Sequence, residues 1–148
     1  MADAAIDSRA GFSDVYVADG DGGYANRVVK LTVYPNNSWQ FRWATDHIYQ
    51  NPHSIALHHS GLLLIADREQ NKTTLLSADG VDLGEFDCGI AYGPAGNDQV
   101  PYGVRTLLKD GLDLGFVAMM DNPQDNRNQK VAVLDLSGLD AEAGARSA

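Results

Sequence analysis

The sequence has a single cysteine, Cys88, among its 148 residues. One cysteine cannot form a disulfide within the chain, and it excludes a zinc module built from several cysteines. We expect Cys88 to be a small residue at the end of a strand. The fold must therefore rest on an apolar core, which a chain of this length can bury without metal or disulfide cross-links.

Basic residues are scarce and long hydrophobic runs are absent. Eleven Lys and Arg against 20 Asp and Glu give a formal net charge of −9. This balance argues against nucleic acid or an anionic membrane as the main partner, because both bind basic surfaces. No run of about 18 apolar residues occurs, so the sequence predicts no membrane span. Residues 1–7 lack the basic start and apolar stretch of a signal peptide, and the compartment stays open.

The motifs of several enzyme classes are missing as well. The Gly-rich turn at residues 20–23 leads into no helical pattern, and neither a P-loop nor a GxGxxG fingerprint is present, which argues against nucleotide binding. No Gly-x-Ser-x-Gly elbow for a serine nucleophile occurs. No segment keeps a sustained helical period, and an Ala-rich stretch near the C-terminus is short.

What the sequence does contain is strand patterning. Residues 14–19 and 27–34 alternate between apolar and polar positions, and residues 39–43 alternate with their aromatic side chains on one face. Gly, Pro and Asn separate these segments. A period of two bounded by turn residues is typical of β-strands, so the sequence predicts an all-β fold.

The strands repeat along the chain. Three apolar strands each end in an aspartate, at Asp19, Asp67 and Asp121, which are 48 and 54 residues apart. Proline-led strands, Pro52–Leu57 and Pro101–Leu107, precede the second and third of these, with their prolines 49 residues apart. A four-stranded unit that recurs every 40–50 residues is typical of a β-propeller blade.

This repeat sets the predicted domain organisation. Residues 11–137 are expected to form about three blades, the first without its opening strand. Residues 1–10 are expected to be a disordered segment and residues 138–148 a flexible tail. Closed propellers have about four to eight blades, so the missing blades are expected from the rest of a longer protein or from a second copy.

His53 is the first candidate for site chemistry. Proline at position 52 begins its strand, so His53 lies near one end of a blade. On an inner strand such a side chain faces the central channel, where a metal takes ligands from several blades. The alternative is a structural histidine that bonds to a carbonyl group. His58 and His59 are adjacent, so in a strand they would point to opposite faces, and we expect them to be exposed loop residues.

Arg68 and Tyr24 are the other candidates. Arg68 directly follows an apolar strand and could bind a carboxylate through its guanidinium group. The alternative is an ion pair with Glu69 or Asp67. Tyr24 lies in the Gly-rich turn, where a phenol can act as a general base or simply pack on a neighbouring turn. Arg27, at the start of the next strand, is expected to pair with Asp19 or Asp21.

Three segments together resemble a known family: residues 14–31, with the Asp-Val-Tyr-Val-Ala-Asp strand and the Tyr-Ala-Asn-Arg turn; Pro52-His53-Ser54-Ile55; and Ala66-Asp67-Arg68-Glu69. They are similar to the NHL-repeat propeller of peptidyl-α-hydroxyglycine α-amidating lyase, also called peptidylamidoglycolate lyase. The similarity covers residues 11–80 well. Over residues 81–136 it consists of the blade pattern alone.

The resemblance implies a six-bladed propeller with a channel zinc held by three histidines from different blades, together with a structural calcium. It implies a lyase that cleaves a peptide substrate ending in α-hydroxyglycine to a peptide amide and glyoxylate. His53 would be a zinc ligand, Tyr24 the base and Arg68 the substrate clamp. Members of the family are secretory or extracellular.

Two other functions remain open at this point. This chain has one Pro-His strand, whereas the family has three, so alone it would supply one zinc ligand and is not expected to be an active lyase. A non-catalytic NHL-type scaffold that binds a protein or peptide on its end face is the main alternative. A metal-dependent sugar lactonase on a similar propeller would need channel Glu, Asn and Asp ligands, which the sequence does not display.

Overall fold

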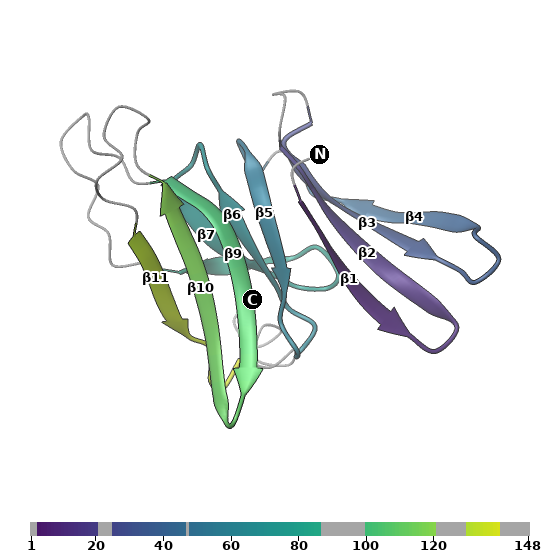
Figure 1. The fold of residues 1–148 in the computed structure, drawn as a ribbon. Coiled ribbons are helices and arrows are strands. Elements are labelled where there is room, and N and C mark those ends of the chain that lie inside the picture. The colour runs from purple at the N-terminus through teal and green to yellow at the C-terminus, as the bar shows by residue number, and fades with distance from the viewer. Residues whose placement is uncertain (1–2, 21–24, 47, 87–99, 121–129, 140–148) are drawn as a thin grey trace.

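The computed structural model describes residues 3–20, 25–46, 48–86, 100–120 and 130–139, with the side chain of Lys130 left aside. These residues form 11 β-strands in three antiparallel sheets, and they contain no helix (Figure 1). No described helix is therefore long and apolar enough to cross a membrane. The prediction of an all-β fold is confirmed.

Each sheet is built from strands that follow one another in the chain. The first sheet has the order β1-β2-β3-β4, the second β5-β6-β7-β8 and the third β11-β10-β9. The strand bounds are β1 Asp3–Arg9, β2 Phe12–Asp19, β3 Arg27–Val33, β4 Trp39–Ala44, β5 Pro52–Leu57, β6 Leu63–Asp67, β7 Lys72–Leu76, β8 Asp82–Phe86, β9 Val100–Lys109, β10 Leu112–Met120 and β11 Lys130–Asp135.

The second sheet is covered on both faces, and its sequence shows why. Strand β6 is apolar at nearly every position, and each of its residues is buried. Leu63 and Ile65 pack into a core shared with the first sheet, whereas Leu64 and Ala66 pack into a core shared with the third. Because successive strand residues point to opposite faces, a continuous apolar run fits a sheet that lies between two others.

The three sheets are arranged as consecutive propeller blades. The innermost strands β1, β5 and β9 lie next to one another and run in the same direction (Figure 1). The outer strands β4 and β8 lie away from this line, as they do in a blade. Meandering sheets that meet along their first strands define a partial β-propeller, so the predicted fold class is confirmed.

Two predictions about the blades need correction. The segment 1–10 was expected to be disordered, yet Asp3–Arg9 forms β1 and pairs with β2 along its whole length. The first unit therefore has four strands, and the third unit has three among its described residues. The short sequence of β1 carries little apolar signal of its own, and its pairing with β2 and contact with β5 become visible only in the structure.

Candidate functional site

His53 lies on the inner strand of the second blade and contacts the third. Its Nδ1 is 3.0 Å from the backbone oxygen of Tyr102 on β9, and the two rings contact each other at a tilt of 35° with their centroids 3.9 Å apart. A carbonyl oxygen can only accept a hydrogen bond, so Nδ1 carries the proton of the neutral ring and Nε2 keeps its lone pair. This hydrogen bond is the one expected of a structural histidine. It also leaves the Nε2 lone pair in the form that metals bind.

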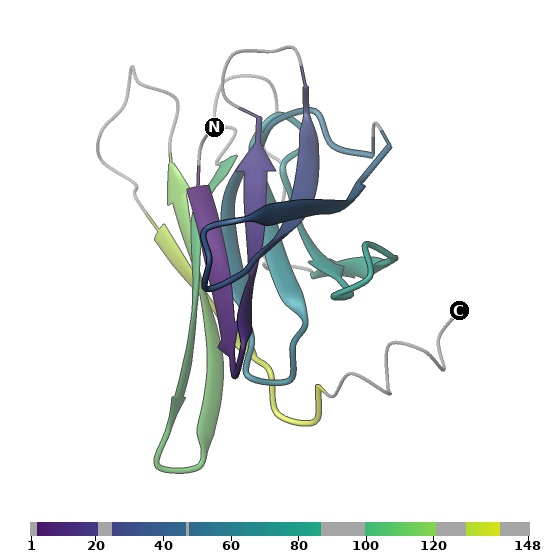
Figure 2. The same ribbon diagram turned by 90° about the vertical axis from the view of Figure 1, so that its right-hand side faces the viewer.

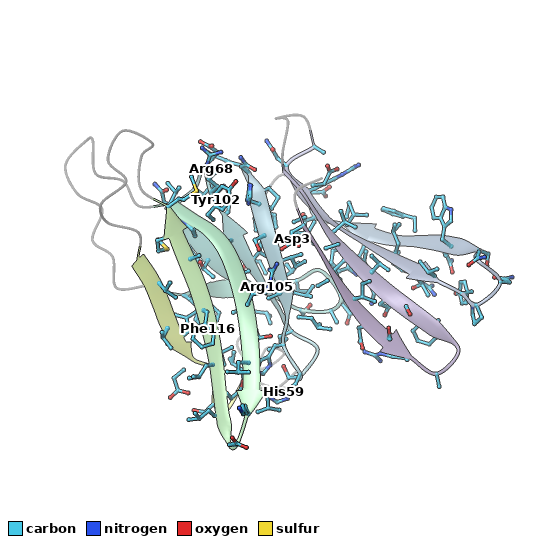
Figure 3. The ribbon with its side chains drawn as sticks, in the orientation of Figure 1. Asp3, His59, Arg68, Tyr102, Arg105 and Phe116 are labelled. Carbon is cyan, nitrogen blue, oxygen red and sulfur yellow. The ribbon has the colours of Figure 1, made fainter. Side chains whose placement is uncertain are left out.

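Arg68 lies at the same end of the second blade as His53. The pairing of Pro52 with Asp67 brings the start of β5 beside the end of β6, and the Arg68 N–H donates to the Asn51 carbonyl over 2.9 Å. Figure 3 shows Arg68 and Tyr102 at this end. The Arg68 Nε is 3.9 Å from a Glu69 carboxylate oxygen, and both side chains are substantially exposed. The guanidinium group therefore has a loose ion pair with Glu69.

A buried aspartate holds this end together. Asp67 is fully buried, and its carboxylate oxygens accept the backbone N–H groups of Gln50 and Asn51, each over 2.8 Å. These bonds fix the entry of the chain into β5. The sequence marked Asp67 as part of a repeat, and the structure shows what its carboxylate does in the second blade.

Tyr24 lies outside the described residues, as do Cys88 and Asp121. The placement of the predicted base relative to His53 and Arg68 therefore stays a prediction. The prediction that Arg27 pairs with Asp19 or Asp21 is confirmed for Asp19, because the Arg27 Nε is 3.4 Å from an Asp19 carboxylate oxygen.

A polar network that the sequence did not reveal joins the three inner strands. The Asp3 carboxylate on β1 accepts hydrogen bonds from the Ser54 hydroxyl on β5 over 2.7 Å and from Arg105 on β9 over 3.0 Å. Burial acts to raise the pKa of Asp3, but hydrogen bonds from Ser54, the Ile55 N–H and Arg105 outweigh it and lower the pKa. Figure 3 shows Asp3 and Arg105 facing each other between the blades.

A second group of titratable side chains lies at the opposite end of the blades. His58 and His59 both contact Asp113 at the start of β10, with Nε2-to-oxygen distances of 2.9 Å and 2.8 Å. The expectation that both histidines are exposed loop residues is wrong for His58, which is 1% exposed. The physical reason is that β5 ends at Leu57, so the two side chains belong to a turn and can lie on one side.

Comparison with known proteins supports the propeller assignment. No family model matches the sequence. The chain is 28% identical over 118 residues to human NHL repeat-containing protein 3, an alignment that covers 74% of this chain. The chain spans 33% of the length of that relative. The similarity and the three sheets together support an NHL-type propeller scaffold.

Proposed function

We propose that the protein is a non-catalytic NHL-type propeller scaffold that binds a peptide through its C-terminal carboxylate. The proposed binding end carries His53, Arg68 and Tyr102. The observation that supports it most is the alignment of the inner strands β1, β5 and β9, which all begin toward this end, with the starts of β5 and β9 in contact through His53 and Tyr102. Surfaces at the ends of propeller blades are common ligand sites, because loops from several blades converge there.

The chemistry of this end favours an anionic ligand group. The protein as a whole carries a net charge of −9, whereas the exposed Arg68 side chain places a positive charge at this blade end. The Arg68 side chain is 41% exposed, and its 3.9 Å separation from Glu69 is longer than a hydrogen bond. A peptide carboxylate can replace this weak partner and form the bidentate pair that a guanidinium group prefers.

Peptide binding by the full-length gene product tests this proposal. Two fluorescein-labelled peptides of the same sequence are compared by fluorescence polarisation, one with a free C-terminal carboxylate and one with an amide. We expect the acid to bind at least about tenfold more tightly, and Arg68→Gln to remove that preference. Arg9→Gln is the matched control, because Arg9 is exposed and lies at the far end of β1. Equal binding of acid and amide, or an unchanged preference in Arg68→Gln, would overturn the proposal.

Peptidylamidoglycolate lyase activity is the second candidate, and the orientation of His53 favours it. The Tyr102 carbonyl holds the His53 ring with Nε2 as the lone-pair nitrogen. A histidine that donates its other ring N–H to a backbone carbonyl is the usual arrangement of a metal ligand. In this candidate Tyr24 is the proposed base and Arg68 binds the substrate carboxylate.

The described residues around His53 do not complete a zinc site. They offer one imidazole, a backbone carbonyl and the ring of Tyr102, whereas zinc takes at least three protein ligands. Zinc and the structural calcium implied by the family resemblance would therefore need ligands from other blades. Glyoxylate release from a hydroxyglycine-extended peptide, measured with the full-length gene product and added zinc, tests the activity. Release that is lost in His53→Ala would support the lyase, and no release or equal rates would reject it.

A further inference from the structure

We propose that His58, His59 and Asp113 form a binding site for a divalent transition metal of the zinc class, at the end of the blades opposite His53. The ligand atoms of the three side chains all lie within 4.8 Å of one another. Two imidazole nitrogens and a carboxylate oxygen suit zinc and its neighbours, whereas calcium and magnesium prefer sites made of oxygen ligands.

The turn after β5 makes this arrangement possible. The Gly61 N–H donates to the His58 carbonyl over 2.9 Å, which closes a tight turn over residues 58–61. Gly61 has a φ of +90°, a conformation that glycine adopts without strain. The two imidazole rings consequently lie with their centroids 4.1 Å apart, and both Nε2 atoms face the carboxylate of Asp113.

The surrounding contacts fix the ligands in position. The Ser60 N–H donates to His58 Nδ1 over 3.3 Å, and Nε2 donates to the Asp113 carboxylate. When Nε2 binds a metal instead, Nδ1 takes the proton and can donate it to the Ser60 hydroxyl oxygen, which is 2.7 Å away. A hydrogen bond to the second ring nitrogen is typical of metal-binding histidines. The Asp113 backbone is held by the Leu136 N–H, which donates to its carbonyl over 2.9 Å. His58 and Asp113 are thus anchored, while the half-exposed His59 can adjust.

A cavity beside the three side chains leaves room for a further ligand. Its volume is about 230 Å³, and its wall is formed by Leu57, Thr106, Leu107, Leu108 and the three proposed ligands. The β9–β10 hairpin extends past the neighbouring strands at this end (Figures 1 and 2). Its residues Thr106, Leu107, Leu108 and Asp113 line one side of the cavity. Three protein ligands with an accessible fourth position are typical of metal sites that bind water or substrate, whereas structural zinc sites have four protein ligands.

The carboxylate of Asp113 faces both imidazole rings. Its two oxygens lie 2.9 and 3.0 Å from the His58 Nε2, and one of them lies 2.8 Å from the His59 Nε2. The three candidate ligand atoms therefore already converge on one position. The alternative is a purely structural cluster in which two histidines share one carboxylate and tie the second blade to the third.

Metal titration of the untagged chain separates these two roles. Zn²⁺ binding is measured by calorimetry, and Co²⁺ is used as a probe because its visible absorption reports the ligand number and type. We expect one Zn²⁺ per chain, with His59→Ala and Asp113→Ala each weakening binding at least about tenfold. Asp79→Ala is the matched control, since it removes an exposed carboxylate from the turn between β7 and β8, away from the three proposed ligands, and should leave the affinity unchanged.

Two further measurements show whether weaker binding in a variant reflects a lost ligand or a misfolded protein. Circular dichroism of each variant establishes that the sheets are retained, and the exposed position of His59 makes its substitution the least disruptive. Ser60→Ala keeps all three ligands and is expected to weaken binding by a smaller factor than His59→Ala. Absence of saturable Zn²⁺ binding, or equal affinity in folded His59→Ala and wild-type protein, would overturn the proposal. The peptide-binding test above does not involve these residues, so the two proposals fail independently.

Discussion

At the scale of single residues, Asp67 shows how one carboxylate can order a blade end. It is fully buried at the end of β6 and accepts two backbone N–H groups from the segment that leads into β5. Without the carboxylate these N–H groups would lose charged partners inside the protein. A buried N–H group without an acceptor lowers the stability of the fold. Asp67 therefore contributes to stability through its hydrogen bonds, although it buries little apolar surface.

We therefore expect Asp67→Ala to lower the free energy of unfolding by about 3 kcal/mol, since the two short hydrogen bonds from Gln50 and Asn51 and a longer one from Gln70 to the carboxylate are lost. Asp67→Asn keeps one acceptor oxygen and should cost less. Exposed Asp79→Ala is the control and should change stability by no more than about 0.5 kcal/mol. Urea unfolding of the three variants measures this, and a fully tolerated Asp67→Ala would contradict the assigned role.

Asp14 gives the protein a predictable response to acid. Its carboxylate pairs with Lys30 at 3.1 Å and accepts the Thr32 hydroxyl over 2.6 Å, and it is 9% exposed. Burial acts to raise its pKa, but the hydrogen bonds from Thr32 and Lys30 outweigh burial and lower the pKa. A lowered folded-state pKa adds stability above the unfolded value of about 3.9 and loses it as pH falls through the folded value.

The urea midpoint should therefore fall as pH is lowered from 5 through about 3.9 and below. Asp3, whose pKa is lowered by hydrogen bonds from Ser54 and Arg105, contributes in the same direction. Asp14→Asn removes one of the carboxylates whose pKa is lowered in the folded state, so its midpoint should depend less steeply on pH than that of the wild type. Parallel pH profiles for the two proteins would show that Asp14 does not contribute.

Sequence reasoning found some site residues and missed others for physical reasons. His53 and Arg68 stood out because a proline and an apolar strand placed them at blade ends. Asp113 gave no signal, because it lies 54 residues from His59 and meets it through the packing of two sheets. Such contacts depend on how blades pack, which strand periodicity alone does not specify.

At the scale of elements, alternation predicted most strands well. The range Pro52–Leu57 was predicted with its observed bounds, and β3 differs from its prediction by one residue. Strands β1 and β8 were missed. Strand β8 contains Gly84 with a φ of +122° and pairs with β7 through a bulge, so its sequence lacks a regular alternation. Both strands lie at sheet edges, where pairing with a neighbour decides the structure.

The contact between the first and second blades depends on the absence of a side chain. A Cβ atom at Gly20 would lie 2.6 Å from the ring of Pro52 and 2.7 Å from the Asn51 side chain. Real Cβ atoms do not approach other atoms so closely, and one of the two is in a rigid ring. The close approach of the end of β2 to the start of β5 therefore requires glycine.

We expect Gly20→Ala to destabilise the protein by about 1–3 kcal/mol through overpacking between these blades. Gly103→Ala is a matched control in β9, because its added Cβ would meet the Ala118 Cβ at an ordinary 3.7 Å. That substitution should be neutral or slightly stabilising, since alanine restricts the unfolded chain. Thermal unfolding compares the two variants, and equal melting temperatures would contradict the expected clash.

At the scale of the whole molecule, the middle blade is covered on both faces and each outer blade is covered on one. The second sheet has packed cores on both faces, whereas the first and third each have one. Strand pairing places a set of apolar side chains on the open face of the first sheet: Ile6, Val15, Val17, Val29, Leu31, Val33, Trp39 and Phe41. On the third sheet, Phe116 and Val133 pair on the open face, as do Ala118 and Val131.

Both open faces are the surfaces that a neighbouring blade covers in a closed propeller. Trp39 is 67% exposed and Phe41 is 54% exposed on the first sheet, and Val131 and Val133 are similarly exposed on the third. Contiguous apolar surface of this kind is unusual on a monomeric protein and marks an interaction site. The repeat spacing predicted about three blades from the sequence, but it could not say which strands remain uncovered.

We therefore expect the isolated 148-residue chain to associate in solution, because water contact with both apolar faces is unfavourable. Sedimentation velocity should show species larger than the monomer, and Trp39→Ser with Phe41→Ser should shift the distribution toward the monomer. Gln40→Ser is the matched control, since Gln40 is exposed on the same strand but points to the other face. A full-length gene product with additional blades should cover these faces and show no such shift. A stable wild-type monomer of the isolated chain with a cooperative unfolding transition would contradict the expectation, and it would mean that three blades suffice as a folded unit.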